Sequence, residues 1–216
     1  MLVVMLPDIA VKNTDIVLVR KLKNDLKSVK NTLLRHAPSS FSSKKLKNLR
    51  IRIFRFPKSE DCNEYFFTYG KKKYVCLNSC LLSRRYYSGF QHLLHGISHA
   101  FCHLKDDIGE EIFAEYVSYS VLIEHLKSKG KRLTRRIIKS IMKTSTKEYN
   151  TFFRIARRLN EKENNYILKL NSKAKNKKIS KRKQTLMFSR YSKSRIRTSK
   201  ETELNIPELE KGFRRI

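Results

Sequence analysis

A stripe of apolar residues at helical spacing is the first clear pattern in the chain. Leu22, Leu26, Val29 and Leu33 recur at intervals of four, three and four, so they share one face of a helix from about 15 to 35. Lysines lie at many of the positions between them. The pattern predicts an amphipathic helix whose apolar face packs on a core.

Strand-like alternation replaces the helical spacing after residue 48. Residues 49–56 alternate between apolar and basic side chains at their start, and the runs 64–69 and 74–77 are rich in aromatic and apolar residues. Gly70 lies between the last two runs, which favours a β-hairpin. Together with a further short strand at 2–6, these runs predict a small antiparallel sheet.

Helical spacing returns downstream. It predicts a helix from about 87 to 104, a turn around Gly109, and a second helix at about 110–127 that Gly130 ends. One or two basic amphipathic helices are expected between 135 and 159. Strands followed by a series of helices are typical of an α+β fold.

Histidines gather in the first helix of this pair. Four of the six histidines of the chain lie there: His92, His95, His99 and His103. Those at 95, 99 and 103 are four residues apart and stack on one helix face. After the turn, Glu111 and Glu115 are also four apart. Two imidazoles and a carboxylate from adjoining helices form the ligand set of a divalent metal site, with zinc as the first expectation.

The sequence does not decide which of the two glutamates is the third ligand. If the turn is centred between the helices, Glu115 lies level with His99, whereas Glu111 lies nearer His103. Two ligand sets fit the pattern: His95 and His99 with Glu115 or Glu111, and His99 and His103 with Glu111. The other glutamate would then orient a ligand histidine, and His92 is expected beside the site or as an alternative ligand.

A family resemblance begins at these residues. The stretch His95–Phe101 resembles the active-site helix of zincin metallopeptidases, whose pattern is His-Glu-x-x-His. Lys73–Asn78 corresponds to the edge strand before that helix, and Glu111–Tyr116 is similar to the Glu-x-x-Ala-Asp/Glu stretch of the gluzincins. The resemblance covers about 47–127. It implies a zincin-like domain with a metal-binding helix pair, one zinc ion, a glutamate as third ligand and a polypeptide substrate.

The chain departs from the family pattern at Gly96, where zincins carry the glutamate that acts as general base. Peptide hydrolysis needs a proton acceptor beside the zinc-bound water, and a positioned general base contributes about 10²–10⁴-fold. Glycine offers none. The resemblance therefore implies a zinc-binding, metallopeptidase-like protein that is inactive or repurposed. Tyr119 is the remaining candidate for contacting a substrate carbonyl.

The excess of basic residues indicates a second kind of partner. The chain has 49 Lys+Arg against 19 Asp+Glu, a net charge of +30, which attracts polyanions. Residues 171–200 contain many basic residues and no acidic one, so a disordered basic tail is expected over 161–216 after a domain at 1–160. Phe188 and Tyr191 are candidates for stacking on bases. The expected nucleic-acid-binding residues are Lys177, Lys178, Lys181, Arg182, Lys183, Arg190, Arg195 and Arg197.

The alternative function is therefore a nucleic-acid-associated basic protein whose metal site is structural or absent. Four cysteines in 216 residues do not form a disulfide scaffold and favour reduced thiols. No apolar run approaches the about 18 residues of a transmembrane helix, and the apolar start lacks the basic segment of a signal peptide. An intracellular location is expected.

Overall fold

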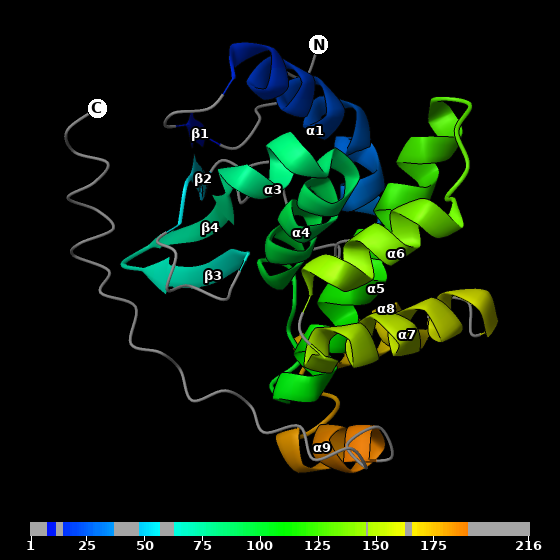
Figure 1. Ribbon diagram of the computed structural model, residues 1–216. Coiled ribbons are helices and arrows are strands. Elements are labelled where there is room, and N and C mark those ends of the chain that lie inside the picture. The colour runs from blue at the N-terminus through cyan, green and yellow to red at the C-terminus, as the bar shows by residue number, and fades with distance from the viewer. Residues whose placement is uncertain are drawn as a thin grey trace.

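Figure 1 shows the computed structural model, which describes residues 8–11, 15–36, 48–56, 63–145, 147–162 and 166–189. The strands are β1 (Asp8–Val11), β2 (Leu49–Phe54), β3 (Glu64–Tyr69) and β4 (Lys72–Asn78). The helices are α1 (Ile16–His36), α3 (Ser79–Arg84), α4 (Tyr86–His99), α5 (Asp107–Ser128), α6 (Arg135–Thr144), α7 (Lys147–Lys162), α8 (Tyr166–Lys175) and α9 (Lys181–Ser189). The α+β class is confirmed.

The four strands form one mixed sheet in the order β1-β2-β4-β3. β3 and β4 pair antiparallel through a turn at Gly70, whose φ of +57° suits glycine, so the predicted hairpin is confirmed. β1 pairs with β2 and β2 with β4 in parallel, so the expectation of an antiparallel sheet is wrong. Alternation along a strand shows which face is buried, but it does not show the direction of the neighbouring strand. The strand expected at 2–6 falls outside the described residues.

The apolar stripes form the core as their spacing predicts. Leu22, Leu26, Val29 and Leu33 of α1 are all at most 3% exposed, and Leu49, Ile51 and Ile53 on one face of β2 are at most 1% exposed. In Figure 1, α4 lies between the sheet and the helices α5, α6 and α7. It packs against β3 and β4 as well as α5 and α6. The helix that carries the histidines therefore joins the sheet to the helical layer.

Gly96 marks the closest approach of α4 to the sheet. A Cβ atom added at this position would lie 2.7 Å from Cγ1 of Val75, a fully buried residue of β4. Real Cβ atoms do not approach other carbons so closely. Close packing therefore explains the glycine, and a glutamate side chain at this position would clash with the sheet.

Substituting Gly96 by alanine is expected to lower the free energy of unfolding by about 1–3 kcal/mol, because overpacking outweighs the higher helix propensity of alanine. Urea unfolding of the single variant and of a double variant with Val75→Ala measures the effect. The cost of Gly96→Ala should shrink by about 1 kcal/mol or more once Cγ1 is gone. An equal cost in both backgrounds would contradict the contact.

The helix expected at 87–104 ends early. α4 stops at His99, and the residues before α5 are not helical. Asn171 of α8 explains the break, because its Oδ1 accepts the backbone N–H of His103 at 2.6 Å and its Nδ2 donates to the carbonyl of Phe101 at 3.2 Å. A distant side chain thus satisfies backbone groups that a longer helix would have paired internally. α5 begins earlier than predicted, with Asp106 as N-cap accepting from the N–H of Gly109.

The prediction of a disordered tail is wrong for residues 166–189, which form α8 and α9. Their scattered apolar residues are enough to attach them, since Ile167, Leu170 and Phe188 are at most 3% exposed. Buried amides add specific contacts, such as Oε1 of Gln184, which accepts the N–H of Lys105 at 2.8 Å. Residues 190–216 lie outside the described part of the chain. Among the described helices, none is both long enough and apolar enough for a membrane span.

Candidate metal centre

Three side chains from α4 and α5 meet at one point. Nε2 of His95 lies 3.3 Å from Oε2 of Glu111, and Nε2 of His99 lies 3.7 Å from the same oxygen. One ligand atom from each of the three residues falls within 4.8 Å of the others. Zinc bonds of about 2.0–2.1 Å in a tetrahedron place neighbouring ligand atoms about 3.3 Å apart. The two histidine–glutamate separations are therefore close to the spacing that a tetrahedral ion requires.

Both imidazoles are oriented by a carboxylate on their other nitrogen. Nδ1 of His95 contacts Oε1 of Glu64, the first residue of β3, and Nδ1 of His99 lies 2.8 Å from Oε1 of Glu110. A carboxylate accepts hydrogen bonds, so each Nδ1 is the donor, and each Nε2 is the nitrogen that faces Glu111. Carboxylate partners of this kind accompany metal-ligating histidines and fix their ring orientation.

The atoms that face the centre lack other partners. Nε2 of His95 and Oε2 of Glu111 are buried, and neither makes a hydrogen bond within the part of the chain that the structure describes. Buried polar atoms without a partner are rare and costly in folded proteins. A divalent cation between them would satisfy both atoms at once, so the residues present fit a metal ion.

Electrostatics keeps the carboxylates of the centre ionised. Burial alone would raise the pKa of Glu111, but the neighbouring imidazoles of His99 and His95 outweigh it and the pKa is lowered. For Glu64, burial is outweighed by His95 and His92, and the pKa falls to about 2. At neutral pH both carboxylates are therefore anionic, the form that binds or supports a cation.

Glu115 occupies a different position from Glu111. Its Oε2 accepts a hydrogen bond of 2.8 Å from Nε2 of Gln91, which also lies 3.1 Å from Oγ of Ser118. Burial raises the pKa of Glu115 to about 7, against the opposing effect of the nearby histidines. The structure therefore brings Glu111 to the two histidines and ties Glu115 to an amide, whereas the sequence left both open as third ligand.

The other two histidines of the cluster lie around the centre in different ways. His92 is buried, with Nδ1 at 3.5 Å from Oε2 of Glu64 and Nε2 at 3.2 Å from Oγ1 of Thr144 on α6. It therefore stands beside the carboxylate that orients His95. His103 comes after the end of α4, so it loses the helical stacking on His99 that the sequence predicted.

Aromatic side chains near the centre differ from the prediction. Tyr119 is 4% exposed and packs edge-on against Phe153 at 5.3 Å, as a core residue does. Tyr149 of α7 was not predicted, yet its ring lies edge-on to His95 at 5.7 Å. Phe66 of β3 stacks on His99 at 5.5 Å. Tyr149 and Phe66 thus each place an aromatic ring against one of the two imidazoles.

Sequence reasoning missed Glu64 and Glu110 as partners of the histidines. Glu64 precedes His95 by 31 positions and belongs to a strand whose pairing was not known. Glu110 adjoins Glu111, and no pattern separates their roles before the crossing of α4 and α5 is seen. Folding alone brings these carboxylates to the histidines.

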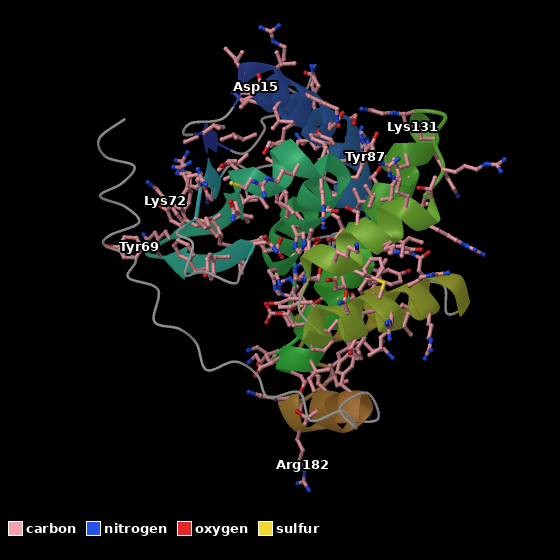
Figure 2. The ribbon with its side chains drawn as sticks, in the orientation of Figure 1. Asp15, Tyr69, Lys72, Tyr87, Lys131 and Arg182 are labelled. Carbon is pink, nitrogen blue, oxygen red and sulfur yellow. The ribbon has the colours of Figure 1, made fainter. Side chains whose placement is uncertain are left out.

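The basic residues proposed for nucleic-acid binding lie on the surface where the structure describes them. Five of them are exposed around the α8–α9 junction and on α9: Lys177, Lys178, Lys181, Arg182 and Lys183. Figure 2 shows Arg182 extending away from α9. Arg190, Tyr191, Arg195 and Arg197 lie outside the described residues. Phe188 is 1% exposed, so base stacking by this ring is wrong.

Comparison with known proteins gives no relative. No family model, no curated protein and no solved structure matches the chain.

Proposed function

We propose that the chain binds one zinc ion through Nε2 of His95, Nε2 of His99 and the carboxylate of Glu111, as a metallopeptidase-like protein without normal peptidase activity. The observation that supports this most is the paired orientation of the two imidazoles. Each Nδ1 is held by its own carboxylate, and each Nε2 is directed at one glutamate oxygen. A chance cluster of histidines has no reason to share that arrangement.

The choice of zinc follows from the donor set. Two imidazole nitrogens and one carboxylate oxygen match the ligands of hydrolytic zinc sites, where the fourth position is left for water or substrate. Bound zinc would lower the pKa of a coordinated water to about 7. The three ligand residues would hold the ion, and Glu64 and Glu110 would accept the hydrogen bonds of the two Nδ1 atoms.

The same geometry argues against efficient peptide hydrolysis. The position after His95 carries no side chain and faces Val75 of β4. Glu115 is engaged by Gln91. Without an acceptor beside the metal-bound water, a loss of about 10²–10⁴-fold in rate is expected from this cause alone. We therefore propose a metal-binding protein with a zincin-like layout in which the proton-transfer group is missing.

Elemental analysis of the purified full chain tests the proposal. Supplied with zinc and then desalted, the wild type should retain about one zinc ion per chain, and His99→Ala should retain almost none. His36→Ala is the matched control, because His36 belongs to α1 and its Nε2 lies near Glu124, 3.6 Å from Oε1 of that residue, and not at the centre. A wild type without zinc, or a His99→Ala variant with wild-type zinc content, would contradict the proposal.

Glu64 provides a finer test of the arrangement. Glu64→Gln should weaken zinc binding by about 10–100-fold, because loss of the carboxylate frees the orientation of His95. Competition with a chromophoric chelator measures the affinity. Glu124→Gln removes a carboxylate far from the centre and should leave the affinity unchanged. Equal affinities for wild type and Glu64→Gln would show that this carboxylate does not support the metal ligands.

A further inference from the structure

A basic cavity lies beside the first turn of α4. It has a volume of about 420 Å³, within the range of small-molecule sites, and is formed by the end of α3, the start of α4 and one face of α6. Five of its ten lining residues are cationic: Arg84, Arg85, Arg136, Lys139 and Lys143. No acidic residue is among the other five. The cavity thus gathers positive charge without internal neutralisation.

The five cations keep their charge available. Each is exposed, and within the described residues none has an ion-pair partner. By contrast, Lys21 and Lys129, close by in the fold, both pair with the buried Asp25. Mutual repulsion between cations gathered in one cavity raises its free energy, and a multivalent anion would relieve it.

Neutral donors in the cavity add directional contacts. Oγ of Ser88, which is 1% exposed, lies 2.7 Å from Oγ of Ser140, and both hydroxyls line the cavity. Hydroxyl protons can rotate towards an acceptor. Arg85 occupies the N-cap position of α4 without a side-chain hydrogen bond to the first turn, so this residue leaves the positive end of the helix dipole uncapped.

The rim of the cavity extends the same chemistry. Nζ of Lys131 donates to the hydroxyl of Tyr87 at 3.2 Å, and the two residues lie on one side of the molecule in Figure 2. Nζ of Lys21 lies 5.4 Å from the centre of the Tyr87 ring. Tyr87 is a lining residue, so Lys131 adds a further cation at the rim of the cavity, whereas the charge of Lys21 is paired with Asp25.

We propose that this cavity binds phosphate groups, with the guanidinium groups of Arg84, Arg85 and Arg136 and the ammonium groups of Lys139 and Lys143 as its cations. A phosphate carries the multiple acceptor oxygens that guanidinium and ammonium donors match. The site is separate from the metal centre, because Tyr87 precedes His95 by eight residues, or roughly 12 Å along the helix. The phosphate belongs either to a small phosphorylated molecule or to a nucleic-acid backbone.

Calorimetric titration of the full chain with inorganic pyrophosphate at low ionic strength tests the site. Saturable binding of one pyrophosphate per chain is expected. Replacing three α6 cations together (Arg136→Gln, Lys139→Gln, Lys143→Gln) should weaken it about tenfold or more. The matched control removes the same charge from exposed positions elsewhere (Lys71→Gln, Lys72→Gln, Lys127→Gln) and should change the affinity less than about twofold.

A single-stranded oligonucleotide separates the two sources of phosphate. A backbone site predicts that the oligonucleotide competes with pyrophosphate and loses affinity in the α6 variant, whereas a small-molecule site predicts that its binding is insensitive to that variant. Absence of saturable pyrophosphate binding, or an equal loss of pyrophosphate affinity in both triple variants, would overturn the proposal. Circular dichroism checks the fold, and the single exposed change Lys139→Glu decides the matter if the triple variant does not fold. Zinc content should stay at the wild-type level in all of them, so failure here leaves the metal proposal intact.

Discussion

Replacing Asp25 by alanine is expected to lower the free energy of unfolding by about 3–5 kcal/mol, because the change removes a buried carboxylate that is the common partner of His125, Tyr86 and two lysines. The Asp25 side chain on α1 is 3% exposed. It accepts a 2.7 Å hydrogen bond from the hydroxyl of Tyr86, contacts Nζ of Lys129, and lies 3.4 Å from Nε2 of His125. One carboxylate therefore joins α1, α4 and α5.

Urea unfolding measures this cost, with Glu124→Ala as the control. Glu124 also pairs across helices, with Arg35 at 2.6 Å, but that pair is largely exposed. Its loss should cost about 0–1 kcal/mol. If Asp25→Ala costs no more than Glu124→Ala, the buried network contributes no more than a surface ion pair.

The Asp25 network also predicts a dependence of stability on pH. Burial raises the pKa of Asp25, but hydrogen bonds from Lys129 and Tyr86 and the charge of Lys21 outweigh it, so the pKa in the folded chain is lowered. A lowered pKa contributes stability that is present above the unfolded value of about 3.9 and is lost as the pH falls through the folded value. The stability difference between wild type and Asp25→Asn should therefore be constant from neutral pH to about pH 5 and shrink below about pH 4.

Replacing Phe188 by alanine is expected to cost about 3–5 kcal/mol, as for other fully buried phenylalanines. The ring is 1% exposed and lies against Gly109 of α5 so closely that a Cβ there would come within 2.7 Å of its Cδ2 atom. The loss should appear in urea unfolding and as faster tryptic cleavage at Lys181–Lys183. Tyr69→Ala removes an aromatic ring that is 49% exposed and should cost little.

A cost for Phe188→Ala as small as that for Tyr69→Ala would show that α9 does not contribute to the core. The test also bears on nucleic-acid binding by the exposed basic residues of α9. If the helix is attached, those side chains are presented on a fixed surface instead of a disordered tail.

Local patterns of the sequence predicted most of the elements but not the contacts between distant ones. The stripe from Leu22 to Leu33 and the alternation of β2 translate directly into buried faces, because each depends only on the period of its own segment. The end of α4 depends instead on Asn171, a side chain of a helix that was expected to be disordered. Such long-range satisfaction of backbone groups leaves no local trace in the sequence.

The candidate site divides in the same way. His95, His99 and Glu111 were visible as a repeat and a resemblance, and the structure brings these three together. The choice between Glu111 and Glu115 requires the angle at which α4 and α5 cross. A spacing argument that treats the two helix axes as parallel lines places Glu115, one turn further along α5, beside His99. The carboxylates that orient the imidazoles required the position of β3 relative to α4.

In the proposed metal centre, Gly96 would also affect how fast a metal ion binds and leaves. Its contact with Val75 fixes the rotation of α4 about its own axis, so the directions of both imidazoles are set by helix–sheet packing. Because such a centre is preorganised, the chain loses little conformational entropy when an ion binds. Zinc would then exchange without refolding of the chain, in contrast to small domains whose fold depends on the metal. In the proposed metal centre, Gly96 would thus both leave the general base absent and help to set the directions of the two histidine ligands.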